Sequence, residues 1–391
     1  MCWNGYEVLE YGVMGDYSLE TLFIGALQDR DFLTTDPSTA KVFVVPQFSI
    51  IDLHLCYSDG IPKSKGCPVT PEGQPVLEVY EIYYENVFKP LLDALEARPT
   101  WKRHGGRDHL FVFPYDYGWN VHPEIPERLS HSLFVGYQGP EYNAVIVPCT
   151  IGRQWHLDGN NGGSFSRFSQ PLTRQCQKQQ AKYLAYFAGT VLKDWAYSHG
   201  VRQALFEMFG NGQDPRILVT TMDSGHDADD VMRNSIFCFC PQGWGSWSAR
   251  IYDVMAHNCI PVVFDKKDFT QELPFRALGF PWEDMVVTIP DGKERHVKAI
   301  LEGISAEEIC KKKAMIADWA PLFLWQGGSG IFLLHLAVNQ WFQELFEGGE
   351  EEMADDQQLQ QQIANLQQQL AQSQTDLAQA QADLQTAQQQ T

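Results

Sequence analysis

Short, unbroken apolar runs that stop at a proline are the feature that most restricts how this chain can fold. They occupy residues 42–45, 110–113 and 144–147, and each is followed directly by proline. Continuous rather than alternating runs are typical of strands that are covered on both faces, as in a parallel sheet flanked by helices. A helical stretch at 76–97 lies between the first two runs. The pattern predicts an α/β fold.

The same rhythm returns in the second half of the chain. Strands are expected at 183–187, 217–220, 235–239 and 260–264, with helices at 201–209, 249–257 and 306–319. Because 391 residues exceed the ~250–300 that one core usually holds, we expect two domains. A polar, glycine-rich stretch at 150–178 is the expected connection. The expected domains are residues 1–175 and 176–347, followed by a tail at 348–391.

The tail combines an acidic stretch at 350–356 with a Gln/Ala/Leu-rich segment. Its apolar residues from Leu359 to Ala387 alternate spacings of four and three, which is a heptad pattern. A helix of this kind needs a partner chain for stability, so residues 359–387 are a candidate homo-oligomer contact. The alternative is a Gln-rich tail that stays disordered.

Charge and composition narrow the partners and the compartment. A net charge of -20 disfavours nucleic acid and anionic membranes, which reward basic surfaces. The nine cysteines include Cys56 and Cys67 on either side of a loop, where either a disulfide or free thiols would fit. No apolar run approaches the ~18 residues of a membrane span, and no signal peptide opens the chain. We therefore expect no membrane anchor within this sequence.

One strand-loop-helix segment at 237–254 contains the candidate residues for binding a phosphate and a ribose. Small residues such as Gly243 would let the backbone approach a phosphate, and the helix N-terminus favours negative charge. Ser248 is expected to cap the helix, and Arg250 can form a forked contact with a diphosphate. Asp253, one turn later, is expected to accept hydrogen bonds from ribose hydroxyls.

The order of residues in this segment resembles the exostosin family. The resemblance covers roughly residues 17–290 and lies in the segments 35–46, 101–109, 183–189, 237–241, 248–250, 258–262 and 273–275, and in Trp282. The chain departs from the family pattern in three ways. Asn258 replaces the usual Gly, an acidic residue is missing before the strand at 144–147, and 212–230 has no match. These departures leave the exact donor open.

What the resemblance implies is an inverting glycosyltransferase with two Rossmann-like domains facing a cleft, the GT-B arrangement. It would move a sugar from a nucleoside-diphosphate donor, a UDP-sugar in the first instance, to a polysaccharide or glycoprotein glycan, in the Golgi membrane or lumen. Arginine can stabilise the leaving diphosphate, so no divalent metal is required, and a carboxylate would serve as the base. The expected donor-binding residues are Arg202, Gly243, Ser248, Arg250 and Asp253, the candidate bases are Asp108 and Asp116, and the supporting residues are His109, Pro241, Cys259 and Pro261.

The sequence predicts no metal site. The acidic triplet at 227–229 fits a metal pattern but is interpreted as a solvated turn, and the His and Cys spacings suit no zinc site.

One alternative function stays open. The fold alone would also fit a catalytically inactive nucleotide-sugar or glycan-binding protein that assembles through its C-terminal coiled coil.

Overall fold

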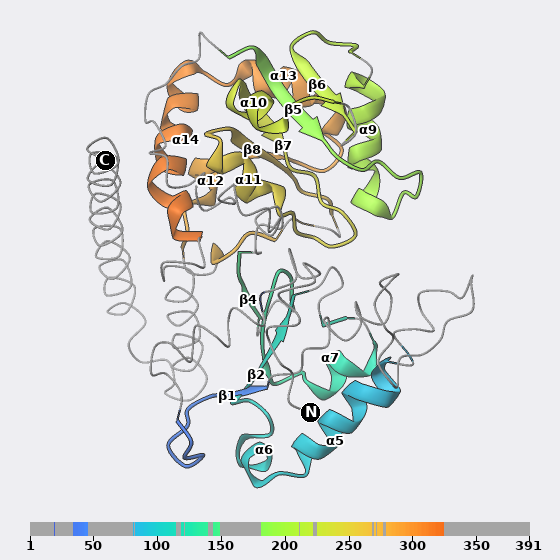
Figure 1. Ribbon diagram of the computed structural model, residues 1–391, viewed down its shortest axis with the longest axis vertical. Coiled ribbons are helices and arrows are strands. Elements are labelled where there is room, and N and C mark those ends of the chain that lie inside the picture. The colour runs from blue at the N-terminus through green and yellow to red at the C-terminus, as the bar shows by residue number, and fades with distance from the viewer. Residues whose placement is uncertain are drawn as a thin grey trace, which may run out of the picture.

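Two parallel sheets organise the chain. The computed structural model describes residues 19, 34–45, 81, 83–114, 119–120, 122–139, 144–148, 181–210, 212–221, 225–267, 270, 272–276 and 279–323. One sheet has four strands in the order β1-β2-β3-β4, and the other has five in the order β6-β5-β7-β8-β9. All the pairings are parallel, and Figure 1 shows one sheet above the other. The predicted α/β class is confirmed.

The N-terminal sheet contains the three proline-stopped runs. Its strands are β1 (Phe43–Val45), β2 (His109–Phe113), β3 (Leu133–Gly136) and β4 (Ala144–Ile146). All five residues of β2 are buried, because Phe111 and Phe113 pack into one cluster while Leu110 and Val112 pack into another on the opposite face. The expected two-sided burial is confirmed for β2, whereas β1 and β4, at the edges of the sheet, are only partly buried. Strand β3 was not predicted, since its run ends in glycine without a proline stop.

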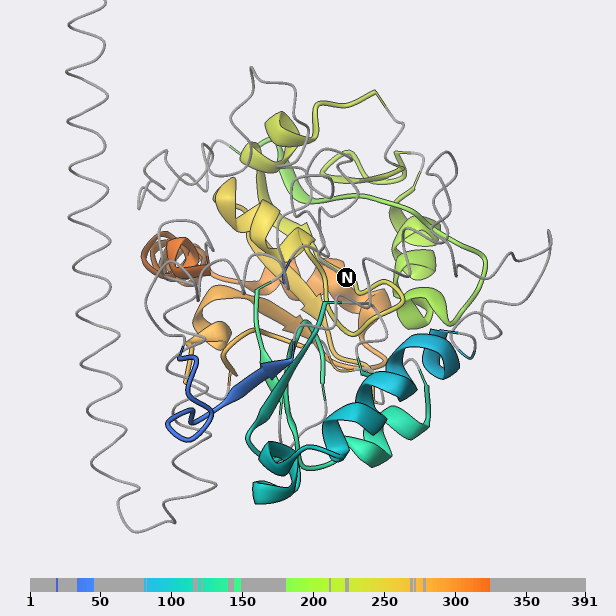
Figure 2. The ribbon, with the colours of Figure 1, turned by 60° about the horizontal axis from the view of Figure 1, so that its bottom comes forward.

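Helices cover one face of this sheet (Figure 2). They are the π-helix η1 (Tyr84–Phe88) and the α-helices α5 (Lys89–Glu96), α6 (Pro99–His104) and α7 (Glu124–Arg128). The helical stretch predicted over 76–97 is confirmed for its described part, which changes from π to α. Pro90 explains the change, because it lacks the N–H that an α-helical bond to the Asn86 carbonyl would require.

The C-terminal sheet has the strand order of a doubly wound fold. Its strands are β5 (Tyr183–Ala188), β6 (Ile217–Thr220), β7 (Ser235–Phe239), β8 (Ile260–Phe264) and β9 (Val287–Ile289). The chain leaves β5 to form β6 on one side and then crosses back to form β7 on the other. In such sheets the direction in which strands are added reverses at one point, here between β5 and β7. Ligands bind next to the carboxyl ends of the two strands at that point. The order therefore points to the loops after β5 and β7.

Three helices were predicted in this half, and two of them have the predicted bounds, whereas α11 (Arg250–Ala256) begins one residue later than expected. α9 (Val201–Phe209) and α14 (Ala306–Trp319) match the predicted ranges. Ser305 and Glu308 form a capping pair at the start of α14, since the Glu308 N–H donates to Ser305 Oγ at 3.1 Å. The other helices are α10 (Ala228–Arg233), α12 (Trp282–Met285), α13 (Val297–Gly303) and the 3-10 turns η3 (Tyr197–Gly200), η5 (Glu294–His296) and η6 (Ala320–Phe323).

Hydrogen bonds join the two sheets near the carboxyl ends of their strands. The Phe275 N–H, beyond β8, donates to the carbonyl of Ile146, the last residue of β4, at 2.9 Å. The N–H and hydroxyl of Ser246, beyond β7, donate to Gln138 Oε1, beyond β3, at 3.0 and 2.8 Å. In Figure 1 the arrows of β2 and β5 point towards the region between the sheets. Carboxyl ends of strands from both sheets thus lie near one region.

Several predictions fall on residues that the structure does not describe. They concern the connection at 150–178, Cys56 and Cys67, Asp116, and the heptad tail at 348–391. Within the described residues, no helix has the length and apolar character that a membrane crossing requires.

Candidate functional site

Two arginines flank one aromatic ring at the reversal point of the C-terminal sheet. The guanidinium carbon of Arg250 lies 4.9 Å from the centre of the Phe187 ring, and that of Arg202 lies 5.6 Å from it. Phe187 belongs to β5, Arg250 opens α11 after the loop that follows β7, and Arg202 lies in the first turn of α9. The structure therefore brings both predicted cations to the edge where the strand order predicts a ligand.

The Arg250 guanidinium has an N–H group that forms no hydrogen bond among the described residues. Its Nε is buried and has no hydrogen-bond partner among the described residues, and no carboxylate of that part of the chain forms an ion pair with it. A buried N–H without a partner costs free energy, and an anionic ligand would recover that free energy through charge-assisted bonds to the partly buried guanidinium. Arg250 thus has the chemistry of an anion-binding residue.

Arg202, in contrast, is used to shape the loops. Its guanidinium donates to the carbonyls of Gln242 at 2.9 Å, Pro241 at 3.2 Å and Thr190 at 3.1 Å, and to the Tyr197 hydroxyl at 2.5 Å. These four bonds fasten the loop after β5 to the loop after β7. Its charge remains beside the site, but these bonds give it a positioning role that sequence reasoning did not foresee.

A glycine that was not singled out as a site residue keeps the approach to Arg250 open. A Cβ on Gly189, directly after β5, would lie 2.8 Å from the Phe187 ring and 3.1 Å from an Arg250 Nη atom. At the predicted Gly243, a Cβ would meet only ordinary contacts, 3.6 Å from Tyr197 and 3.7 Å from Arg202. The structure therefore requires a glycine at 189 more strictly than at 243. The signal for Gly189 was its position at the end of the segment 183–189.

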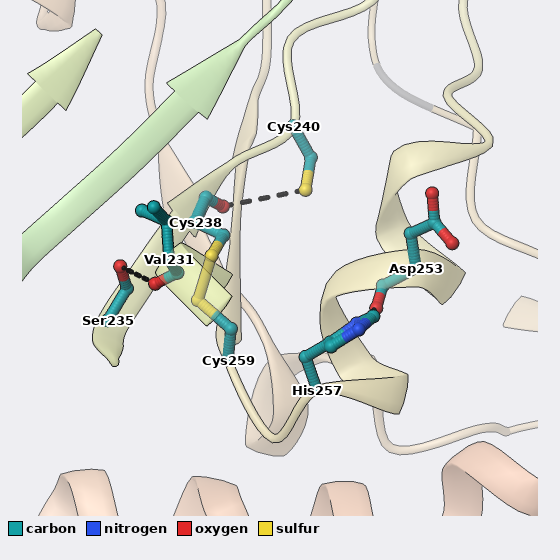
Figure 3. Close-up of a disulfide and its surroundings, with 7 residues drawn as sticks. All are labelled: Val231, Ser235, Cys238, Cys240, Asp253, His257 and Cys259. Atoms are coloured by element: carbon teal, nitrogen blue, oxygen red, sulfur yellow. Dashed lines mark hydrogen bonds between the residues drawn. A yellow bond between two sulfur atoms is a disulfide. The ribbon is translucent and has the colours of Figure 1, made fainter. Parts of the chain in front are cut away.

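Helix α11 begins one residue later than a cap by Ser248 would require. Its N-cap is Ala249, which offers no side-chain cap, so the predicted capping role of Ser248 is wrong. The Ser248 carbonyl instead accepts from the Ile251 N–H at 3.3 Å. Asp253 lies one turn after Arg250, as expected, with its side chain half-buried. Its backbone carbonyl bonds to His257 Nδ1 at 2.7 Å (Figure 3).

A disulfide lies behind these loops. Cys238, in β7, is bonded to Cys259, the residue before β8 (Figure 3). Sequence reasoning missed this pair, although both cysteines belong to motif segments on consecutive predicted strands. Asn258, which stands where the family usually has Gly, has φ 57°. This left-handed conformation favours Gly and tolerates Asn, so the replacement keeps the turn into β8.

The other motif residues in this region are structural. Pro261 lies within β8, paired with Cys238 in the ladder. Cys240 is a buried free thiol, and burial raises its pKa to about 12. It is therefore protonated at neutral pH and is no nucleophile.

Asp108 is at the opposite end of its strand from the expected site. It precedes β2, is fully buried, and pairs with Arg103 at 2.7 Å and with His109 at 2.9 Å. Burial lowers the pKa of His109, while the Asp108 carboxylate acts in the opposite direction. Ligands of parallel sheets bind at the carboxyl ends, so this placement argues against Asp108 and His109 as reacting groups. The other candidate base, Asp116, lies outside the described residues but follows the carboxyl end of β2 in sequence.

Glu272 is a carboxylate that sequence reasoning did not select. It is half-buried, its N–H donates to the Ser246 carbonyl at 2.7 Å, and burial raises the pKa of its side chain against the opposing effect of Arg276. Its signal was its place before the motif at 273–275. The acidic triplet at 227–229 is more ordered than the solvated turn expected. Asp227 caps α10 by accepting from the N–H groups of Asp229 and Asp230. In this part of the chain no group of three or more His, Cys, Asp or Glu side chains is placed to hold a metal ion.

Comparison with known sequences places this arrangement in a family. The family model of the Exostosin GT47 domain matches residues 8–304, which is most of the chain. This chain belongs to the exostosin GT47 family. The match covers both sheets and every motif on which the resemblance depended, and the recognition made from the motifs is confirmed.

Curated relatives carry glycosyltransferase names. The probable beta-1,4-xylosyltransferase IRX10L of Arabidopsis thaliana is 26% identical over 270 residues, covering 66% of this chain and 61% of that protein. The probable glucuronosyltransferase GUT1 of Oryza sativa subsp. japonica is 25% identical over 300 residues, covering 73% and 64%. A probable glucuronosyltransferase 47 A of Physcomitrium patens is 25% identical over 314 residues, covering 77% and 63%. This GT47 chain therefore spans less than two thirds of the length of these relatives.

Proposed function

We propose that this exostosin GT47 protein is an inverting glycosyltransferase that transfers a sugar from a nucleoside-diphosphate donor to a glycan. The observation that carries the proposal is the partly buried Arg250, whose Nε has no hydrogen-bond partner among the described residues, at the reversal point of the C-terminal sheet. Membership of the family and the transferase names of the relatives support it. The two facing Rossmann-like domains of the GT-B arrangement are part of the same proposal.

The donor side follows from the contacts. The Arg250 guanidinium would bind the diphosphate as negative charge develops on the leaving group, which is the largest electrostatic requirement of the reaction. Gly189 leaves the space, Arg202 fixes the loops around Gly243, and Asp253 would bind the ribose. Because arginine supplies the positive charge, we propose that turnover needs no divalent metal. The xylosyl and glucuronosyl names of the relatives make UDP-xylose and UDP-glucuronic acid the first donors to test.

The acceptor side requires a base opposite the leaving group. Asp116 is the first candidate, since it follows the carboxyl end of β2, and Glu272 is the second, since it lies beside Ser246 where the two sheets meet. A base works best with a pKa near the operating pH, and the burial of Glu272 moves its pKa in that direction. Asp108 is not proposed.

The compartment and the assembly complete the proposal. The Cys238–Cys259 disulfide and a further disulfide at Cys310 suit an oxidising lumen such as that of the Golgi. A polysaccharide such as a cell-wall glycan is the proposed acceptor. Oligomerisation through residues 359–387 stays a prediction, because these residues lie outside the described part of the chain.

Donor turnover tests the proposed function. Wild-type protein is incubated with UDP-xylose or UDP-glucuronic acid, with and without a xylan oligosaccharide, and released UDP is measured. We expect turnover that falls by about 100-fold or more in Arg250→Ala and persists in Arg295→Ala. Arg295 is a suitable control because it is an exposed arginine that pairs only with Glu207 among the described residues. Tight UDP binding without turnover of any donor would favour an inactive binding protein instead.

A further inference from the structure

Four large hydrophobic side chains are exposed among the described residues. They are Trp195 at 65%, Val87 at 39%, and Leu192 and Trp244 at 37% each. All except Val87 belong to the loops that follow β5 and β7. We call Leu192, Trp195 and Trp244 the aromatic rim. Exposed apolar clusters of this kind mark binding surfaces, whereas single exposed residues do not.

The loop that carries Leu192 and Trp195 is held by several hydrogen bonds. The Gln203 side-chain amide, on α9, donates to the carbonyls of Leu192 at 2.7 Å, Asp194 at 2.9 Å and Tyr197 at 3.2 Å. The Asp194 carboxylate accepts from the Ala196 N–H at 3.0 Å. An exposed ring on such a fixed loop loses little conformational entropy when a ligand binds, which is the advantage of preorganisation.

The backbone under Trp195 is strained. Ser198, His199 and Gly200 have consecutive φ values of 66°, 46° and 80°. Left-handed conformations are costly for residues other than Gly and persist where surrounding contacts impose them. Here the Ser198 N–H donates to the Gly243 carbonyl at 2.8 Å, and the His199 ring stacks on Trp195 with ring centres 5.0 Å apart and planes at 29°. The turn therefore joins the exposed ring to the loop that precedes Arg250.

The rim is continuous with the proposed donor site. Trp244 contacts Tyr197 edge to face, with ring centres 5.1 Å apart, and the Tyr197 hydroxyl accepts from Arg202. A path of direct contacts thus runs from the exposed rings to the arginine that shapes the phosphate side. A ligand on the rim would therefore lie next to the loops of the proposed donor site.

The chemistry of the rim selects one class of ligand. A pyranose ring in a β-1,4-linked glycan has two apolar faces, which present C–H groups. Its equatorial hydroxyls lie around the edge of the ring and remain hydrated. Tryptophan offers a broad apolar face with low conformational entropy, so it can cover a sugar ring without drying the hydroxyls. We propose that the aromatic rim is an acceptor subsite in which Trp195 stacks on a pyranose ring of a β-1,4-linked glycan. The assignment of that glycan as the acceptor rests on the proposed function.

Calorimetric titrations with separate probes test the rim. Wild type, Trp195→Ala, Trp195→Phe, Val87→Ala and Arg250→Ala are each titrated with β-1,4-linked xylohexaose, with cellohexaose and with UDP. Trp195→Ala is expected to bind the oligosaccharide about tenfold more weakly and UDP within about twofold of wild type. Trp195→Phe keeps a ring and should retain most of the oligosaccharide affinity. Val87→Ala removes an exposed apolar side chain on η1 and should leave both ligands unaffected.

The other outcomes either overturn the acceptor subsite or separate it from the proposed donor site. Failure of wild type to bind either oligosaccharide, or equal oligosaccharide binding by wild type and Trp195→Ala, would overturn the subsite. Loss of UDP affinity alone in Trp195→Ala would assign the ring to the nucleotide and would also overturn it. Arg250→Ala should show the reverse profile, with UDP binding lost and oligosaccharide binding kept. Oligosaccharide binding through Trp195 without any UDP binding would support the rim and reject the proposed donor site.

Discussion

Removal of the Cys238–Cys259 bridge should lower the stability of the C-terminal sheet by a calculable amount. The two cysteines are 21 residues apart, and closing a loop of that length in the unfolded chain is worth about 3 kcal/mol at 25 °C. Both side chains are fully buried, so replacement by Ala adds a packing cost. Cys240→Ala, a buried free thiol next to the end of β7, measures that packing cost without touching the bridge.

The assay is thermal unfolding of Cys238→Ala, Cys259→Ala, the double variant and Cys240→Ala. Either single variant already breaks the bridge, so the double variant should lose far less than the sum of the singles, with a coupling of about 3 kcal/mol. For a domain of this size that corresponds to a fall in Tm of about 6–12 °C per single variant beyond the Cys240→Ala control. Losses that simply add, or single variants no less stable than Cys240→Ala, would refute the reasoning.

Other substitutions test separate features. Gly189→Ala should push the Phe187 ring against Arg250 and weaken UDP binding. Overpacking should lower the free energy of unfolding by about 1–3 kcal/mol, which thermal unfolding measures. Unchanged UDP affinity would contradict the close approach of Gly189 to Arg250. Asn258→Gly should be neutral or slightly stabilising at φ 57°, whereas Asn258→Val should cost about 1 kcal/mol or more. Burial lowers the pKa of Lys313, so the unfolded state binds more protons and stability should rise with pH up to the unfolded value of 10.5. Lys313→Met should abolish that rise and raise the unfolding free energy at pH 7 by about 1 kcal/mol; a drop in Tm would contradict it.

The strands of the C-terminal sheet were predictable because burial on both faces leaves an uninterrupted apolar run. β6, β7 and β8 have the predicted bounds for this reason. β3 was missed because Gly136 ends its run, and β9 because a three-residue strand with an exposed Thr288 gives no distinct pattern. The helical stretch over 76–97 was predictable, but its change from π to α was not, because that change depends on the single N–H that Pro90 lacks and not on the hydrophobic pattern.

The site was predictable only where sequence order alone places residues together. Arg250 follows a predicted strand and loop, so its position at a carboxyl end could be inferred. The role of Arg202 in fixing carbonyls, and the need for glycine at 189, depend on distances that no spacing encodes. Asp108 lies one residue before β2. The motif at 101–109 spans the start of this strand, so the motif alone does not show at which end of the sheet the carboxylate lies.

A crystal structure of the full chain with UDP tests the central claim most directly. The account predicts the diphosphate between Gly189 and the loop after β7, with phosphate oxygens within hydrogen-bonding distance of the Arg250 guanidinium. UDP seated elsewhere, or an Arg250 side chain that keeps its stacking on Phe187 without touching a phosphate, would contradict it.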